Sequence, residues 1–153
     1  MTPLVVIGCG NELRGDDAVG PCVSRQVARW NRPSVRGLAV HQLTPELISE
    51  FETTERIVFV DAACAADRVG WQAVKREAAF PVLGHVATPG GLVTLADAIC
   101  VRIPRTWRVT VPAREFGFGR RLSPVALRGA RTVLRQLAAV IRSVSRCQIV
   151  DRA

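Results

Sequence analysis

One short segment near the start of the chain constrains its fold more than any other. Residues 4–7, Leu-Val-Val-Ile, form an apolar run rich in β-branched side chains, which predicts a buried strand. A loop with three glycines follows over residues 8–15, and glycine accepts backbone angles that other residues avoid. The adjacent carboxylates of Asp16 and Asp17 come next, just before a helical pattern. Because α/β proteins bind ligands beyond the carboxyl ends of their strands, this segment predicts a fold and a site together.

Apolar runs and amphipathic stretches alternate along the rest of the chain. The pattern predicts strands near residues 4–8, 38–43, 56–60, 72–76 and 107–111, and helices near residues 18–30, 44–51, 88–100 and 123–141. Pro45, Pro89 and Pro124 fall at helix starts, where the missing N–H is not needed for a helical hydrogen bond. Alternation of this kind predicts an α/β fold with a mostly parallel sheet covered on both faces.

Length and apolar content limit the class of protein. The 153 residues suit one domain spanning residues 1–153. No apolar run approaches the roughly 20 residues that cross a bilayer, and no basic segment precedes the first apolar run as in a signal peptide. We therefore expect no membrane partner.

The cysteines indicate a reducing compartment. They occur without a Cys-x-x-Cys pair and among apolar neighbours, which predicts reduced thiols in the core. A nucleophilic Cys9 or Cys64 stays an alternative, since both lie near predicted strand ends. The full set is Cys9, Cys22, Cys64, Cys100 and Cys147.

The chain is basic, with a formal net charge of +8 that comes almost entirely from arginine. Arginines of the last predicted helix fall at helical spacings on one face, which is typical of the solvated side of a terminal helix. A basic protein also attracts nucleic acid or acidic protein surfaces. The lack of Tyr and of aromatics interleaved with basic residues argues against a nucleic-acid partner. The arginines of this face are Arg128, Arg131, Arg135, Arg142 and Arg146.

Three polar side chains follow predicted strands or precede a predicted helix. Right-handed crossovers bring the ends of successive parallel strands to one edge of the sheet. Asp17 after the first strand, Asp61 at the end of the third and His85 ahead of a helix start can therefore converge. Two carboxylates and an imidazole suit a divalent metal such as zinc, nickel, manganese or iron, with positions left open for water or substrate.

Each of these three residues also has a purely structural interpretation. Asp17 can cap its helix, Asp61 can accept hydrogen bonds from loop amides, and His85 can be a surface residue. Other catalytic motifs are missing from the sequence. Leu13 replaces the third glycine of a dinucleotide fingerprint, and neither a Walker loop nor a Gly-x-Ser-x-Gly elbow is present. Only His41 and His85 are available as the base of a nucleophilic triad.

Four separated segments of the chain match one known family in order. The first is Gly-Cys-Gly-Asn-Glu-Leu-Arg-Gly-Asp-Asp-Ala-Val-Gly at residues 8–20, and the second is Ile-Val-Phe-Val-Asp-Ala at residues 57–62. The third is His85 with the helix predicted at residues 89–96. The fourth is Val-Thr-Val-Pro at residues 109–112, with a turn over residues 119–124. Through these segments the sequence resembles the NiFe-hydrogenase maturation endopeptidases over nearly its whole length.

The resemblance implies a fold, a reaction and a site. It implies a three-layer α/β/α sandwich with a twisted, mostly parallel sheet of about five strands. It also implies a monomeric cytoplasmic peptidase of aspartic type, which removes the C-terminal extension of a hydrogenase large-subunit precursor after nickel insertion. Asp17, Asp61 and His85 match the family's metal ligands, so we expect them to be catalytic. We expect them to hold nickel carried by the substrate, with other divalent ions able to substitute.

The sequence departs from the family after the second predicted strand. Many members carry an acidic, glycine-rich turn there, whereas this chain has His-Gln-Leu-Thr at residues 41–44. We expect Gly10, Asn11, Asp16 and His41 to contact the substrate, although His41 can equally be a hydrogen-bonded strand residue. Two other classes stay open: a non-enzymatic nickel-binding maturation chaperone, and a basic module that binds nucleic acid or phosphate at the glycine loop.

Overall fold

Five strands form one twisted sheet in the computed structural model, which describes residues 2–78, 87–99 and 102–150, the last seven by their backbone alone. The strand order across the sheet is β2-β1-β3-β5-β4. Strands β2, β1, β3 and β5 run parallel, and β4 is an antiparallel strand at one edge. The strands are β1 (Leu4–Cys9), β2 (Val35–Val40), β3 (Arg56–Ala63), β4 (Gly70–Ala73) and β5 (Arg105–Pro112).

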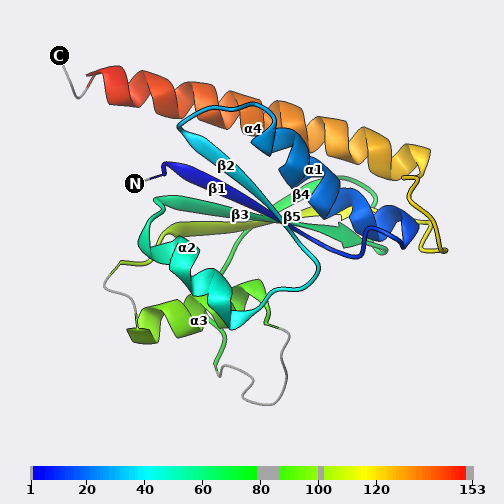
Figure 1. Cartoon of the computed structure of the whole chain (residues 1–153), viewed down its shortest axis with the longest axis horizontal. Helices are drawn as coiled ribbons and strands as arrows, with labels where there is room; N and C mark the ends of the chain where they lie inside the picture. The colour runs from blue at the N-terminus through cyan, green and yellow to red at the C-terminus, as the bar shows by residue number, and fades with distance from the viewer. Residues whose placement is uncertain (1, 79–86, 100–101, 151–153) are drawn as a thin grey trace.

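Helices cover both faces of this sheet, which confirms the predicted three-layer α/β architecture (Figure 1). Helices α1 (Val19–Ala28) and α4 (Pro124–Val150) lie on one face. Helices α2 (Ile48–Glu52) and α3 (Pro89–Ile99) lie on the other. Short 3-10 turns over Gly15–Ala18 and Pro45–Leu47 lead into α1 and α2.

Alternate residues of each central strand enter two separate cores. Val6 packs with α1 and α4, whereas Val5 and Ile7 pack with α2 and α3. Phe51 of α2 and Leu137 of α4 are fully buried on opposite sides of the sheet. Burial of a side chain of this size contributes about 1.5–3 kcal/mol, so the two cores together hold the sheet between its helical layers.

Strand β2 lies three residues earlier than the sequence pattern predicted. It pairs with β1 from Leu4↔Val35 to Cys9↔Val40, so it ends where its partner ends. Val35 is buried, and His41 and Gln42 lie beyond the strand. The apolar run at residues 38–43 therefore marks the end of a strand and the start of the crossing to α2.

The expectation that the cysteines are core thiols is wrong for the side chains that the structure describes. Cys22 and Cys64 are exposed and Cys9 is half-buried, all three as free thiols. The buried face of α1 is formed by valines together with Gly20 and Ser24, and Gly20 lets the helix lie close to the sheet. Cys100 lies outside the described residues, and the side chain of Cys147 is not described.

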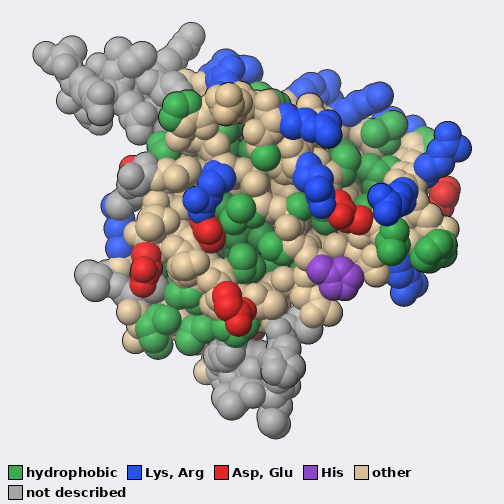
Figure 2. Space-filling view, viewed as in Figure 1, with side chains coloured by type: hydrophobic (Ala, Val, Ile, Leu, Met, Phe, Trp, Pro, Cys, Tyr) green, Lys and Arg blue, Asp and Glu red, His purple; other side chains and the backbone are tan. Residues whose placement is uncertain are grey.

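Helix α4 is basic along its outer face. Figure 2 shows basic side chains gathered along the edge that this helix forms, and the basic residues of α4 are all arginines. Arg128, Arg131, Arg135 and Arg142 are all exposed, which confirms the predicted solvated face. Within the described part of the chain, no helix is both long and apolar enough to span a membrane.

Two glycines let the start of α1 approach β1. A Cβ atom on Gly8 would collide with the backbone carbonyl of Gly20 and approach the Ser24 hydroxyl. A Cβ atom on Gly20 would collide with the carbonyl of Val60 on β3. The loop between β1 and α1 is therefore held against the sheet by contacts that only glycine permits.

We expect Gly8→Ala to lower the free energy of unfolding by about 1–3 kcal/mol, because a backbone carbonyl has no rotamer with which to give way. Chemical denaturation followed by Trp fluorescence measures the change. Gly117→Ala is the matched control, since a Cβ there meets nothing within 4 Å. Equal stability of the two variants would contradict the close approach.

Candidate functional site

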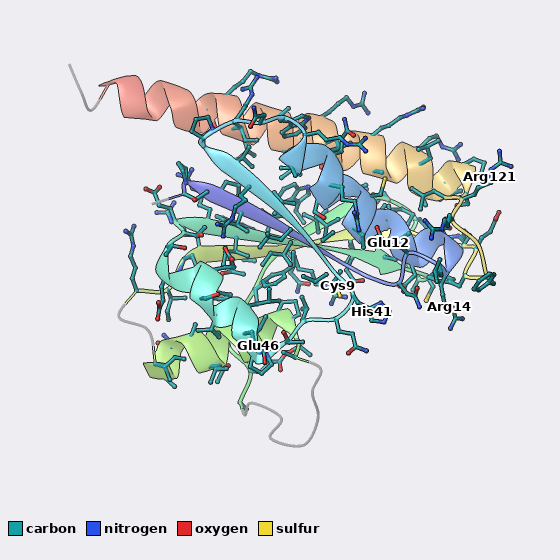
Figure 3. All side chains as sticks on the ribbon, in the orientation of Figure 1. Cys9, Glu12, Arg14, His41, Glu46 and Arg121 are labelled. Carbon is teal, nitrogen blue, oxygen red and sulfur yellow. The ribbon has the colours of Figure 1, made fainter. Side chains whose placement is uncertain are left out.

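The carboxyl ends of β1 and β3 lie side by side and carry the two predicted acidic ligands. Strands β1 and β3 are parallel neighbours, paired from Val5↔Ile57 to Gly8↔Val60. Asp61 follows directly on this paired region, and Asp17 lies in the turn after β1. Figure 3 places Cys9 and His41 at the same end of the sheet, close to the loop that carries Glu12 and Arg14.

Asp17 binds the glycine loop and does not cap α1. Its Oδ2 accepts a hydrogen bond from the backbone N–H of Asn11 at 2.7 Å. No side-chain capping bond is present at the start of the 3-10 turn or of α1. Gly10 has a φ of +151°, and a Cβ there would collide with the Asp17 carbonyl. The loop thus closes tightly around a half-buried carboxylate.

Asp61 forms an ion pair with Arg108, a residue that the sequence analysis did not identify. The Arg108 Nη2 lies 3.0 Å from Asp61 Oδ2, and the two side chains are 42% and 38% exposed. The register places Arg108 opposite Phe59, two residues before Asp61, so the two side chains share one face of the sheet. A charged residue inside the apolar strand predicted at 107–111 was the available signal.

Cys9 lies close to both carboxylates. Burial, followed by the negative charges of Asp61 and Asp17, raises the pKa of this thiol to about 11. The Sγ donates a weak hydrogen bond to the His41 carbonyl at 3.6 Å. A thiol with this pKa is protonated at neutral pH, which disfavours Cys9 as a nucleophile. The two carboxylates follow the carboxyl ends of the neighbouring strands β1 and β3, at the edge of the sheet where Cys9 ends β1.

The third predicted ligand, His85, lies outside the described residues. Within residues 2–78, 87–99 and 102–143, no three His, Cys, Asp or Glu side chains are placed to share a metal ion. Ala87 lines the same hollow as Asp61. The metal-ligand set of Asp17, Asp61 and His85 thus stays a prediction.

Two hollows adjoin along this end of the sheet. The first has a volume of about 460 Å³ and is lined by Cys9, Asp61 and Arg108, with residues that precede α3. The second has a volume of about 470 Å³ and is lined by Gly10, Asn11 and His41. Cys9 and Gln42 line the first hollow, and their chain neighbours Gly10 and His41 line the second, so the two hollows are next to each other.

The structure brings together three of the four predicted substrate contacts. Gly10, Asn11 and His41 line one hollow, and His41 is exposed. His41 lies after β2 and not inside a strand. The fourth predicted contact, Asp16, does not line this hollow. Its side chain has no exposed surface and cannot contact a substrate in this conformation.

Asp16 instead ties the glycine loop to the segment that precedes α4. Its carboxylate accepts hydrogen bonds from the N–H groups of Arg114, Glu115 and Ser123 and from the Ser123 hydroxyl, at 2.6 to 3.0 Å. Burial alone would raise the pKa of Asp16, but these bonds outweigh it and hold the pKa below its ordinary value of 3.8. Asp16 is therefore a structural anion.

The arrangement of β-strands and helices matches solved structures of hydrogenase maturation proteases. One is the NiFe hydrogenase maturation protease HycI of Thermococcus kodakarensis KOD1, with a TM-score of 0.72 and 18% identity over 92% of this chain and 93% of that chain. Another is the hydrogenase maturating endopeptidase HybD of E. coli, with a TM-score of 0.64 and 18% identity over 94% of each chain. A third is the NiFe hydrogenase maturation protease HybD of Thermococcus kodakarensis, with a TM-score of 0.64 and 21% identity over 92% of this chain and 99% of that chain.

The likeness is one of fold. No protein-family model and no curated protein sequence matches the chain. At identities near 20% the shared architecture covers almost the whole of each chain, while the activity of this chain is a separate question. The resemblance seen in the sequence is thus confirmed at the level of the fold.

We expect Asp16→Asn to lower the free energy of unfolding by about 2–4 kcal/mol near pH 7, because an amide nitrogen would face a hydrogen-bond donor. The lowered pKa makes the contribution of Asp16 complete above pH 3.8, and it is lost as the pH falls through the folded-state value. Denaturation at pH 7 and pH 3 should therefore show the difference between wild type and variant shrinking in acid.

A constant difference over this pH range would contradict the assignment of Asp16 as a structural anion. Asp67→Asn is the control, since Asp67 pairs with Arg114 through a side chain that is 96% exposed. Loss of such a surface pair changes stability by about 1 kcal/mol or less.

Cys9 should react with iodoacetamide more slowly than the exposed Cys64 at pH 8, because its thiolate fraction is on the order of 0.1%. Replacing Asp61 or Asp17 by Asn removes a nearby negative charge and should speed the alkylation of Cys9 severalfold. Peptide mass spectrometry measures both rates within one molecule. Unchanged rates in both variants would place the carboxylates away from the thiol.

Proposed function

We propose that this protein is an endopeptidase that removes the C-terminal extension of a NiFe-hydrogenase large-subunit precursor. The observation that carries the proposal is the placement of Asp17 and Asp61 at the carboxyl ends of the neighbouring parallel strands β1 and β3, in a sheet with the fold of hydrogenase maturation proteases. Parallel α/β sheets place their ligands at this edge. The two adjoining hollows supply room for an extended chain on either side of Cys9.

We infer that Asp17, Asp61 and His85 hold nickel that the precursor carries as part of the substrate. Carboxylate and imidazole ligands fit nickel, and other divalent ions can take the same set. Cleavage would then follow nickel insertion, because an empty precursor offers nothing for these side chains to bind. The metal site of the substrate would position the adjacent peptide bond against the enzyme.

Asp61 is suited to change partners when such a substrate arrives. Its present ion pair with Arg108 is about 40% exposed on both sides, and exposed pairs contribute about 1 kcal/mol or less. Binding to a metal ion can exceed this amount, so Asp61 can turn toward nickel while Arg108 stays in the hollow. Arg108 then offers a cationic group to the substrate, for example to a peptide carbonyl.

Two chemical steps are compatible with this arrangement. The metal can polarise the scissile carbonyl or an attacking water, or a carboxylate of the pair can act as a general base toward that water. In both cases the bond from the Asn11 N–H to Asp17 would fix the carboxylate in place. We assign Gly10, Asn11 and His41 to the path of the precursor's chain. We further propose that the protein acts as a monomer in the cytoplasm.

Asp17→Ala, Asp61→Ala and His85→Ala should each abolish removal of the extension from nickel-loaded precursor, with a loss of at least about 100-fold in rate. Intact-mass spectrometry of the precursor follows the reaction. Asp67→Ala is the matched control, because it removes an exposed carboxylate that pairs with Arg114. Normal processing by the Asp17 or Asp61 variant would contradict the proposal.

The same experiment separates the alternative functions. A nickel-binding chaperone would bind loaded precursor without changing its mass. A nucleic-acid or phosphate module would bind DNA or RNA in a salt-dependent way, and Asp17→Ala would leave that binding unchanged. Only a peptidase shortens the precursor at its C-terminus.

A further inference from the structure

Acidic residues are missing from one entire helical layer of this protein. The sequence contains no Asp or Glu over residues 18–45 or over residues 116–150. These two stretches hold α1 and α4, the helices that together cover one face of the sheet. The arginines of the two stretches are Arg25, Arg29, Arg32, Arg36, Arg120, Arg121, Arg128, Arg131, Arg135, Arg142 and Arg146.

The arginines of α4 have no neutralising partner within the described structure. Arg128, Arg131, Arg135 and Arg142 are exposed, and none forms an ion pair with a described carboxylate. Their spacing of three, four and seven residues keeps them on one side of the helix. The like charges of this row repel one another, and a partner of opposite charge would relieve that repulsion.

Apolar side chains lie between these charges. Leu134 lines a hollow together with Arg128, Arg131 and Arg135. A second hollow between α4 and the end of α1 is lined by Trp30, Arg32 and Arg142. Arginine and tryptophan are the residues most enriched at the energetic centres of protein interfaces. The face therefore combines a cationic rim with partly buried apolar patches, which is typical of a protein contact surface.

We propose that the α1–α4 face docks an acidic surface of the protein that this enzyme processes. The inference rests on the proposed function and concerns a different surface from the hollow on the α2–α3 side of the sheet, which Asp61 lines. Charge complementarity selects an acidic occupant. A protein surface fits better than single-stranded nucleic acid, because α1 and α4 contain no aromatic residue and Trp30, just after α1, is only partly exposed, so the two helices offer no series of rings for stacking on bases.

Docking on this face is rigidly coupled to the site. The Ser123 hydroxyl donates to Asp16 and accepts from the N–H of Ala126 in the first turn of α4. The start of α4 is thus fixed to the same loop that holds Asp17. A precursor seated on α4 would be presented to the sheet edge in a defined orientation, and attraction at long range would speed its arrival.

The test compares a charge-reversed variant, Arg128→Glu with Arg131→Glu and Arg135→Glu, with a charge-retaining variant that has Lys at the same three positions. Rates are measured on full-length nickel-loaded precursor at about 50 and 300 mM salt. We expect the KM of the reversed variant to be about tenfold above that of the wild type at low salt, with kcat unchanged. This difference in KM should become smaller at high salt. The Lys variant should behave like wild type. Equal KM values for all three proteins would overturn the inference.

Further arms separate the causes of failure. Arg76→Glu changes the net charge at an exposed position next to Asp97 of α3, and it should leave KM unchanged. If the wild type does not shorten the precursor, the proposed function fails, and direct binding of precursor to wild type and reversed variant still decides the docking question. Tighter binding of duplex DNA than of precursor, lost in the reversed variant, would replace the acidic protein by nucleic acid and overturn the inference.

Discussion

The candidate site depends on one buried anion, Asp16. Its carboxylate satisfies donors from Arg114, Glu115 and Ser123, all about 100 residues further along the chain. Without those donors a fully buried carboxylate would be too costly to keep charged, and without the carboxylate three N–H groups and a hydroxyl would lack a partner. The glycine loop, the turn that carries Asp17 and the start of α4 all take their positions from this contact.

The neighbouring Asp17 has the opposite character. It is half-buried, and among the described residues its side chain accepts a hydrogen bond from the N–H of Asn11 alone, which leaves capacity for another partner. Asp61 likewise makes a weak, exposed ion pair with Arg108. Of two adjacent acids in one loop, Asp16 is therefore fully engaged by hydrogen bonds within the fold, and Asp17 keeps acceptor capacity for the role proposed above. The sequence alone does not separate them, because the difference comes from donors in a distant segment.

Much of the architecture was predictable because local signals agreed with the global fold. The apolar run at residues 4–7, the prolines that open helices and the hydroxyl of Ser123 before α4 all mark real boundaries. Pairing to β1 fixed the ends of β2, which no local pattern encodes. Arg108 and the burial of Asp16 were missed for the same reason, since both depend on strand register or on contacts between distant segments. The expected ligand His85 lies outside the described residues and stays a prediction.

The long sequence separation within the Asp16 contact has a consequence for biosynthesis. The loop after β1 leaves the ribosome early, yet its anchor at Ser123 is made more than 100 residues later. Until then Asp16 is a solvated carboxylate on an unanchored loop. Strand β1 likewise cannot pair with β3 until β3 has been synthesised. Asp16 and Asp17 are therefore synthesised long before the segment that orders their loop. The difference in burial and hydrogen bonding between the two carboxylates arises only when synthesis has reached the last helix.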